Sequence, residues 1–199
     1  GETMMSIAVR CAKEGLGGME FASGIPGTLG GTVSMNAGAY EKEMKDIVKA
    51  VRILTQEGEI KEIPNEEMAF GYRTSAVLKN NWIVLGATLQ LEADDPARIQ
   101  ARIDDFTHRR RTRQPLEYAS AGSTFKRPEG FFAAKLIDEA GMKGFSVGDA
   151  QVSEKHAGFV VNKGKASAED VLALMGRIQA AVKDKFGVDL KPEVRIIGE

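Results

Sequence analysis

Two neighbouring stretches of the chain alternate apolar and polar side chains with the period of two that is typical of half-buried strands. The first covers 47–54, and the second covers 59–63 after a Glu57-Gly58 turn signal. Because such a turn joins adjacent antiparallel strands, these runs predict a hairpin. A proline followed by Asn and two Glu predicts a short helix start at 64–67, and the apolar run at 83–91 predicts another strand.

Helical spacing of apolar residues occurs at the beginning of the chain. Met5, Ala8 and either Cys11 or Ala12 fall on one face of a helix. Gly15 stands where a left-handed C-terminal cap belongs. We therefore expect an amphipathic helix within residues 1–15. Because no initiator methionine precedes it, we also expect that this chain begins inside a longer protein.

A second helix is predicted after Asp94, because Asp94 and Asp95 supply N-terminal acids and Pro96 suits the first turn. Its expected inner face consists of Ile99, Ile103 and Phe106. Its C-terminal end, where the helix dipole favours cations, carries Arg109, Arg110, Arg111 and Arg113. These arginines lack interleaved aromatic residues, so a solvated helix end is a better interpretation than a nucleic-acid surface.

The remainder of the chain mixes helices with short strands. Pro115 breaks the helical pattern and marks an expected domain boundary. We expect a loop at 117–129, a helix at 131–140, strands at 150–153 and 158–162, and a last strand at 194–197. The segment Ser167-Ala168-Glu169-Asp170 resembles a capping box and predicts a long helix that ends at Gly187. Because strands and helices do not alternate strictly, the prediction is an α+β fold.

Composition narrows the class of protein. Hydrophobic residues make up 43% and charged residues 28% of the chain, and the formal net charge is -1. The chain can therefore bury a core, and no overall field attracts it to nucleic acid or to an anionic membrane. Its single cysteine, Cys11, excludes a disulfide framework, and no residue spacing suggests a metal site. We expect a cytoplasmic protein with no membrane insertion and no nucleic-acid partner.

The glycine-rich stretch that begins at Gly24 is the first candidate for function. Four glycines fall within eight residues, at Gly24, Gly27, Gly30 and Gly31. Glycines expose backbone N–H groups and admit a phosphate closely. Pro26 interrupts the run and no Gly-Lys-Ser/Thr follows, so neither a Rossmann turn nor a P-loop is predicted. From these residues alone, a ligand-binding loop and a glycine-rich connector are equally good interpretations.

Three further segments carry chemically useful side chains. In Phe70-Gly71-Tyr72-Arg73-Thr74-Ser75 an arginine follows a tyrosine, which by itself is more typical of a packed or solvated surface pair. In Ser120-Ala121-Gly122-Ser123-Thr124-Phe125-Lys126-Arg127-Pro128 two serines precede two cations, which suits an anion-facing loop or a polar turn. In Pro192-Glu193-Val194-Arg195-Ile196-Ile197-Gly198 alternation alone explains an ordinary strand. Since His108 and His156 lack a nucleophile motif, no Ser-His-Asp set is predicted.

In this order, the segments resemble the MurB family, the UDP-N-acetylenolpyruvoylglucosamine reductases of peptidoglycan synthesis. The resemblance covers almost the whole chain and rests on residues 24–40, 71–75, 121–128, 156–162 and 192–198. The short connection between Arg73 and the serine-containing loop is similar to the compact second subtype of the family. Family members carry, before the point where this chain begins, a further segment with its own glycine-rich flavin loop.

The resemblance implies a particular domain organisation. An α+β fold would combine the C-terminal part of an FAD-binding domain, of the PCMH/vanillyl-alcohol-oxidase-like type, with a smaller α+β substrate-binding domain. Residues 1–113 would form the FAD-binding domain, incomplete because its N-terminal subdomain is missing. Residues 114–187 would form the substrate-binding domain, and 188–199 a C-terminal strand that returns to the FAD-binding part.

The resemblance also implies an activity. An NADPH-dependent flavoenzyme containing FAD would reduce the enolpyruvyl group of UDP-N-acetylglucosamine enolpyruvate to UDP-N-acetylmuramate, in cell wall biogenesis and hence cell shape and cell division. Hydride would pass from NADPH to FAD and then to the double bond, and a proton would complete the lactyl group. The partner is thus a small nucleotide-sugar substrate, while the oligomeric state is left open.

Residue roles follow from the same resemblance. Ser123 matches the proton donor, and Arg73 and Glu193 match the pair that binds the substrate carboxylate and stabilises the enolate. The expected cofactor-binding residues are Gly24, Ile25, Pro26, Gly27, Thr28, Gly30, Gly31, Asn36, Ala37 and Gly38. The expected substrate-binding residues are Tyr72, Tyr118, Lys126, Arg127, His156 and Asn162.

Two alternative functions stay open at this point. One is an FAD-linked oxidase of the same fold that acts on another substrate, against which the motifs around Ser123 and Glu193 argue. The other is a non-catalytic nucleotide-sugar-binding fragment. Flavin absorbance of the purified protein distinguishes a flavoenzyme from such a fragment.

Overall fold

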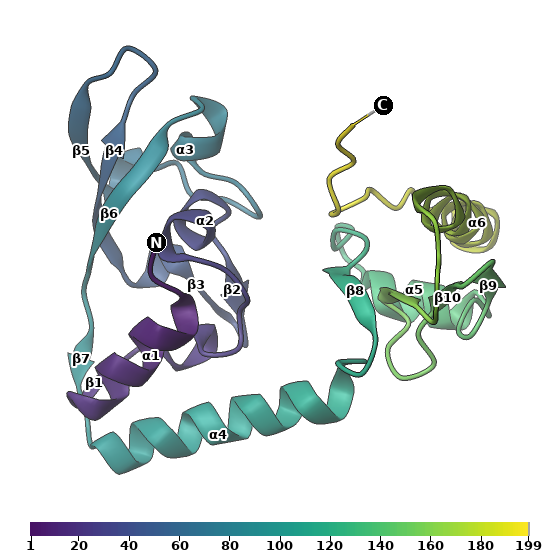
Figure 1. The fold of residues 1–199 in the computed structure, drawn as a ribbon, viewed down its shortest axis with the longest axis horizontal. Helices are drawn as coiled ribbons and strands as arrows, with labels where there is room; N and C mark the ends of the chain where they lie inside the picture. Colours follow the sequence, from purple (N-terminus) through teal and green to yellow (C-terminus); the bar gives the residue numbers. More distant parts are fainter. Residues whose placement is uncertain (199) are drawn as a thin grey trace. The chain divides into compact units, whose positions relative to one another are not determined.

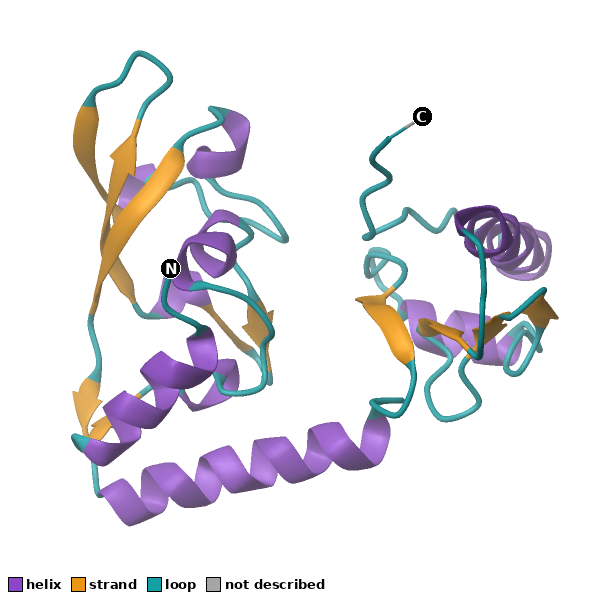
Figure 2. Cartoon of the chain, in the orientation of Figure 1, coloured by secondary structure: helices purple, strands orange, loops and turns teal. Residues whose placement is uncertain are grey.

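The computed structural model describes residues 1–198, and these residues form two compact units (Figure 1). The first unit is Gly1–Arg110, and the second begins at Arg111. Each unit has its own hydrophobic core and mixes helices with strands, so the fold is α+β (Figure 2). The division after Arg110 falls three residues before the boundary expected after residue 113.

The elements of the first unit alternate irregularly along the chain. Its helices are α1 (Met4–Lys13), α2 (Leu29–Ser34), α3 (Ala76–Lys79) and α4 (Pro96–Arg113), the last of which runs across the boundary. Short 3₁₀ helices are η1 (Glu20–Ala22), η2 (Met44–Asp46) and η3 (Asn65–Glu67). Its strands are β1 (Leu16–Gly17), β2 (Gly38–Ala39), β3 (Lys42–Glu43), β4 (Val48–Leu54), β5 (Ile60–Pro64), β6 (Ile83–Leu89) and β7 (Glu92–Ala93).

The largest sheet of the first unit is antiparallel, with strand order β5-β4-β6. Val48, Val51 and Ile53 of β4 are buried. A register shift in the pairing with β6, between Val48 and Ala50, accommodates the three-residue step from Val48 to Val51. Helix α2 lies beside β6 and contributes the buried Val33 to the same core (Figure 1). The hairpin predicted from alternation and the third strand predicted from the apolar run are therefore confirmed, with ends that differ by one or two residues.

Helices α1 and α4 pack against each other through small and β-branched residues. Ala12 of α1 forms a buried cluster with Ile99 and Ile103 of α4. The predicted inner face of α1 was wrong by one position at its start, because Met4 is buried whereas Met5 is about half exposed. Thr3 caps the helix and thereby fixes its starting phase, since its hydroxyl accepts a hydrogen bond from the Ser6 N–H at 3.2 Å.

The second unit is a four-stranded antiparallel sheet with two helices. Its strands are β8 (Ala119–Ser123), β9 (Ser146–Val147), β10 (Ala150–Val152) and β11 (Phe159–Asn162), in the order β8-β11-β10-β9. Its helices are α5 (Ala133–Glu139) and α6 (Ala168–Phe186). Helix α6 buries Leu174, Met175, Ile178 and Val182. The predicted capping box is confirmed, because Ser167 and Asp170 exchange side-chain-to-backbone hydrogen bonds.

Two expectations for the second unit were wrong. The region expected to be a loop at 117–129 contains strand β8, which pairs with β11. The strand expected at 194–197 is not formed, since pairing in this region is limited to an isolated bridge between Phe125 and Pro192. The strand propensity of Val194 and Ile197 is not sufficient without a partner that supplies ladder hydrogen bonds. Whether residues 188–199 return to the FAD-binding part stays a prediction.

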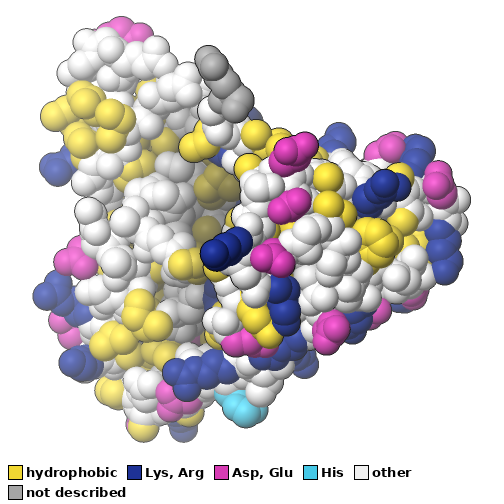
Figure 3. Space-filling model, turned by 45° about the vertical axis from the view of Figure 1, so that its right-hand side comes forward, with side chains coloured by type: hydrophobic (Ala, Val, Ile, Leu, Met, Phe, Trp, Pro, Cys, Tyr) yellow, Lys and Arg dark blue, Asp and Glu magenta, His cyan; other side chains and the backbone are white. Residues whose placement is uncertain are grey.

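On the face drawn in Figure 3, Lys and Arg side chains are interspersed with Asp and Glu side chains. Within residues 1–198, every helix is too short or too polar to cross a membrane. Among those same residues, no group of His, Cys, Asp and Glu is arranged to hold a metal ion.

Candidate functional site

The glycine-rich segment is a packed turn followed by a short helix. A Cβ on Gly24 would lie 3.0 Å from Nη1 of Arg110, so the arginine stem packs directly on this glycine. Burial lowers the pKa of Arg110, because desolvation disfavours its charged form. A Cβ on Gly30 would contact Val84 of β6 at 3.5 Å. Close packing inside the unit therefore accounts for Gly24 and for the position of Gly30.

Gly27 has a different role. Its φ of 142° lies in a region that residues with a side chain rarely adopt, and the space beyond its Cα is open. Gly27 and its neighbours Pro26 and Thr28 are exposed. This strip presents main chain that a ligand can approach closely. The first turn of α2 offers less than expected, because the N–H groups of Leu29 and Gly31 are bonded to the Glu2 carbonyl and the Thr28 hydroxyl.

Asn36 connects the glycine-rich segment to its surroundings. Its amide Nδ2 donates to Oε2 of Glu43 at 2.9 Å and to the Gly71 carbonyl at 3.1 Å. Its Oδ1 accepts from the Lys45 N–H at 2.9 Å. Asn36 is fully buried with a φ of 42°, a conformation that Asn adopts more readily than most residues. The side chain predicted to bind a cofactor is thus occupied by bonds within the unit.

Arg73 lies in a tight turn that Asn36 holds in place. Gly71 and Thr74 exchange main-chain hydrogen bonds of 3.1 and 3.2 Å, so Tyr72 and Arg73 form the two-residue tip. Arg73 has a φ of 56°, which is uncommon for a residue with a side chain and recurs at functional sites. Its guanidinium lies 5.1 Å from the centre of the Tyr72 ring.

An open polar cleft of about 360 Å³ adjoins this turn. Its lining includes Gly38, Tyr72 and Arg73, together with the charged residues Glu41, Lys42, Glu43, Lys45 and Asp46. Gly38 is required by the β2–β3 hairpin, because a Cβ there would lie 2.5 Å from the Lys42 carbonyl oxygen. The structure therefore brings together, within the first unit, three residues that the sequence analysis assigned to cofactor binding, catalysis and substrate binding.

In the second unit, Ser123 lies next to the C-terminal segment that carries Glu193. Ser123 ends β8 opposite Phe159 and is exposed. The Glu193 N–H donates to the carbonyl of Thr124 at 2.9 Å, which places Glu193 beside the residue that follows Ser123. The hydroxyl of the buried Thr124 accepts from the Val160 N–H at 3.1 Å and ties this edge to β11. Two of the three predicted catalytic residues thus lie on adjacent segments of main chain.

His156 and Asn162 mainly shape turns of the second unit. The Gly158 N–H donates to Nδ1 of His156 at 3.2 Å, and the ring meets Phe159 edge-on at 5.0 Å. Burial lowers the pKa of His156, so its neutral form is favoured in the folded protein. Oδ1 of Asn162 accepts from the N–H groups of Gly164 and Ala166, at 2.9 and 3.0 Å. Their predicted substrate contacts stay predictions.

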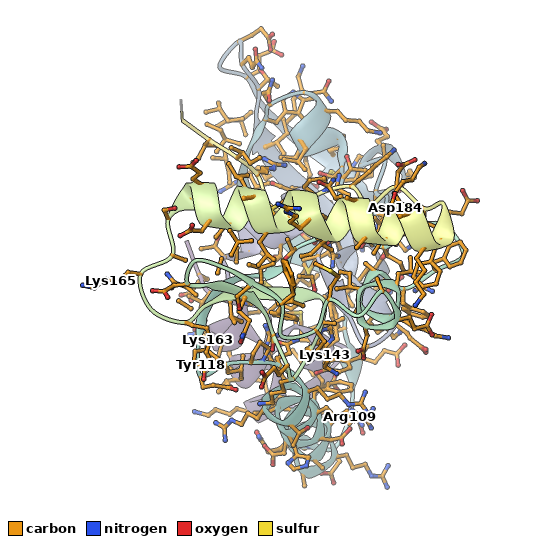
Figure 4. The ribbon with its side chains drawn as sticks, turned by 90° about the vertical axis from the view of Figure 1, so that its right-hand side faces the viewer. Arg109, Tyr118, Lys143, Lys163, Lys165 and Asp184 are labelled. Carbon is orange, nitrogen blue, oxygen red and sulfur yellow. The ribbon has the colours of Figure 1, made fainter. Side chains whose placement is uncertain are left out.

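Tyr118 forms a pair with a lysine that the sequence analysis did not select. Nζ of Lys163 donates to the Tyr118 hydroxyl at 2.6 Å and lies 3.8 Å from the ring centre (Figure 4). Lys163 follows Asn162 directly, so its place after a motif residue was the available signal. The pair adds a cation to a predicted substrate-binding tyrosine.

A mostly apolar cavity of about 360 Å³ lies beside the same strands. Its lining comes from β8, β11, the start of α6 and Val194, and includes the predicted substrate-binding residue Asn162. Lys126 and Arg127 are exposed on the segment that follows Ser123. The Lys126 N–H bonds to the Lys191 carbonyl at 2.8 Å, so the main chain of this segment is fixed. The surface near Ser123 therefore combines apolar, cationic and hydroxyl groups.

Comparison with known families agrees with this division of the chain. Residues 1–64 match the FAD binding domain family, and residues 114–197 match the C-terminal domain of UDP-N-acetylenolpyruvoylglucosamine reductase. With the α+β fold, these matches define the class: an FAD-binding domain joined to a reductase C-terminal domain.

The relatives specify the family. UDP-N-acetylenolpyruvoylglucosamine reductase of Clostridium tetani is 52% identical over 199 residues, covering 100% of this chain and 65% of that protein. The enzyme of the same name from Clostridioides difficile is 58% identical over 187 residues, covering 94% and 62%. The crystal structure of the Thermus caldophilus reductase (MurB) matches with a TM-score of 0.82 at 37% identity, covering 96% and 68%. The chain belongs to the UDP-N-acetylenolpyruvoylglucosamine reductase family.

The match covers nearly all of this chain but only part of each relative. The chain spans about 65% of the length of the Clostridium tetani relative. The expected membership of the family and the expected FAD-binding fold are confirmed. The assigned site residues and the three domain ranges stay predictions.

Proposed function

We propose that this chain is part of a cytoplasmic flavoenzyme that uses NADPH to reduce the enolpyruvyl group of UDP-N-acetylglucosamine enolpyruvate to UDP-N-acetylmuramate. The observation that carries the proposal is the main-chain bond of 2.9 Å from Glu193 to Thr124, which pairs the segment that carries Glu193 with the end of β8 that carries Ser123. A carboxyl and a hydroxyl are the groups that a carbanion-forming reduction of an enolpyruvyl ether needs from this unit.

FAD is the implied cofactor, and the first unit contains main chain that suits it. The exposed strip at Gly27 admits close approach of a phosphate, and Gly38 borders the polar cleft that also contains Arg73. The side chain of Asn36 bonds Glu43 and Gly71 and so supports this surface from within. When bound, FAD supplies the hydride chemistry, while the protein supplies position and charge.

Ser123 would donate the proton. A hydroxyl holds its proton far above neutral pH, so it delivers that proton to a strongly basic enolate carbon and to few weaker bases. Its place at the end of β8 supports the role, because pairing with Phe159 fixes its main chain while its side chain is exposed. Substrate can therefore reach the hydroxyl directly.

Arg73 and Glu193 would hold the carboxylate of the substrate and stabilise the enolate. A guanidinium matches a carboxylate with two parallel hydrogen bonds, which fixes its orientation. Turn geometry supports this role for Arg73, since the turn keeps a strained backbone that a surface arginine would not need. Glu193 would need a proton, or a tight arginine partner, to assist, because two adjacent carboxylates repel each other.

The anionic nucleotide part of the substrate would lie against the cations of the second unit. Lys126 and Arg127 are exposed three and four residues after Ser123, and Lys163 donates a hydrogen bond to the Tyr118 hydroxyl. The apolar cavity beside β8 and β11 suits the uncharged parts of a nucleotide sugar. His156 and Asn162 would act through the turns that they stabilise.

Both relatives described above are UDP-N-acetylenolpyruvoylglucosamine reductases, which does not favour the alternative of an FAD-linked oxidase for another substrate. The proposal is tested by recording flavin absorbance and then NADPH oxidation in the presence of UDP-N-acetylglucosamine enolpyruvate. UDP-N-acetylglucosamine, which lacks the double bond, is the matched control. We expect NADPH oxidation with the first sugar and none with the second. Equal rates with both sugars, or oxidation coupled to oxygen and another substrate, would exclude the proposed reaction.

A further inference from the structure

An exposed aromatic ring of the second unit lies against the side chain of Arg127. Cζ of Arg127 is 4.0 Å from the centre of the Phe132 ring, the distance of a cation–π contact. Phe132 is 59% exposed, and the neighbouring Phe131 is 45% exposed. Within the described chain, Phe132 is not a member of the hydrophobic core of its unit. Core packing therefore does not explain why a phenylalanine occupies position 132.

The position of Phe132 at the start of α5 also does not favour a phenylalanine. Phe132 is the N-cap residue of α5, and its side chain makes no capping hydrogen bond. Ser, Thr, Asp or Asn would satisfy a helical N–H at this position, whereas a phenylalanine does not. An exposed ring and an uncapped helix thus coincide at one residue. The contact with Arg127 is the interaction that this ring provides.

The main chain between Arg127 and Phe132 folds so that the two side chains meet. The Phe131 N–H donates to the Pro128 carbonyl at 3.2 Å and closes a four-residue turn, in which Gly130 has a φ of 73°. On the other side, Phe125 is buried and bridged to Pro192. The main chain is therefore fixed both before Arg127 and after it, and the ring is folded back over the guanidinium.

We propose that Phe132 is a positioning residue that holds the Arg127 guanidinium in the plane that receives the diphosphate of the nucleotide sugar. The inference rests on the proposed function, which places Arg127 near the anionic part of the substrate. A guanidinium whose plane is set in advance loses less rotational freedom when it forms two parallel bonds to a phosphate. NADPH also contains a diphosphate, so the test compares both ligands.

The experiment measures binding by calorimetry with UDP-N-acetylglucosamine as the probe, and with NADP⁺ as the second probe. We expect Phe132→Ala to weaken binding of the sugar nucleotide about fivefold, which is the order of a cation–π contribution. Phe131→Ala is the matched control, since it removes a neighbouring exposed ring that does not stack on Arg127, and should leave the Kd within about twofold. Phe132→Trp should restore the Kd, and Phe132→Ala should add nothing to Arg127→Ala.

Each outcome decides one claim. Equal Kd values for wild type, Phe132→Ala and Phe131→Ala overturn the positioning role, and so does a wild-type chain that does not bind the probe. Weakening confined to NADP⁺ overturns the assignment to the nucleotide sugar. If Phe132-dependent binding is found but the wild-type protein fails to oxidise NADPH with the enolpyruvyl sugar, the positioning role stands and the proposed function fails.

Discussion

The side-chain amide of Asn36 donates a 3.1 Å hydrogen bond to the carbonyl of Gly71 and so joins the glycine-rich segment to the turn that carries Arg73. These residues are 35 positions apart in the chain. The same side chain also bonds Glu43 and the main chain of Lys45, which border the cleft next to Arg73. One buried amide thus fixes the surfaces proposed for cofactor and for substrate relative to each other within the first unit.

We expect Asn36→Ala to lower the free energy of unfolding of the first unit by about 2–4 kcal/mol, because the three hydrogen bonds of the buried Asn36 side chain are lost. Chemical denaturation followed by the fluorescence of Trp82 measures the change. Asn80→Ala is the control, since Asn80 is exposed and its side chain bonds one helical carbonyl. An equal, small loss in both variants would contradict the connecting role of Asn36.

Arg73→Lys should lower kcat about 100-fold, because a lysine cannot form the two parallel bonds that a guanidinium forms with a carboxylate and its enolate. Arg52→Lys, on an exposed position of β4, should leave kcat unchanged. Steady-state kinetics of the FAD-loaded protein provide the measurement. Wild-type turnover in Arg73→Lys would contradict the proposed bidentate contact.

The contact between Arg102 and Asp94 should make stability depend on pH. The hydrogen bond from Arg102, 2.6 Å from Oδ2, lowers the pKa of Asp94 below its ordinary value. The carboxylate therefore contributes stability above the pKa of the unfolded chain, and this contribution is lost as the pH falls through the lower folded pKa. We expect Asp94→Asn to reduce the loss of thermal stability between about pH 5 and pH 3. Asp104→Asn, on the exposed side of α4, is the control, and an unchanged slope in Asp94→Asn would contradict the assignment.

His156 should give the second unit a pH dependence nearer to neutrality. Its pKa is lowered by burial, so the unfolded chain takes up a proton at a higher pH than the folded chain. Stability is then full above the ordinary histidine pKa of about 6.5 and decreases as the pH falls toward the folded value. Thermal unfolding measured at about pH 7.5 and at about pH 5, on either side of the ordinary histidine pKa, gives the size of this decrease. We expect His156→Gln to flatten it, and His108→Gln serves as the comparison.

Local signals predicted the parts of the fold that local hydrogen bonds determine. Ser167 and Asp170 mark the N-terminal end of α6, and Asp95 marks the N-terminal end of α4. Each of these side chains accepts a hydrogen bond from an N–H group within one turn. The same reasoning failed for β8, whose small residues have little strand propensity and become a strand through pairing with β11. At Val194 and Ile197 a strand was predicted and is not formed, because these residues favour a strand but lack a paired neighbour in the described structure.

The candidate site also depends on contacts between residues far apart in the chain, which local sequence signals do not show. The resemblance named Ser123, Arg73 and Glu193, but no periodicity could show that Glu193 lies beside Thr124, because that bond joins residues far apart in the chain. Lys163 and Phe132 escaped notice for a similar reason, since each is defined by its contact with Tyr118 or Arg127. Asn36 was assigned to the cofactor, whereas its bonds within the unit became visible only in the structure.

Transient kinetics of Ser123→Ala test the central claim most directly, because the two halves of the reaction can be followed separately by flavin absorbance. We expect the variant to accept hydride from NADPH at the wild-type rate, since no proton from Ser123 is needed there. Mixing the reduced variant with UDP-N-acetylglucosamine enolpyruvate should then give almost no reoxidation. Reoxidation at the wild-type rate would contradict Ser123 as the proton donor.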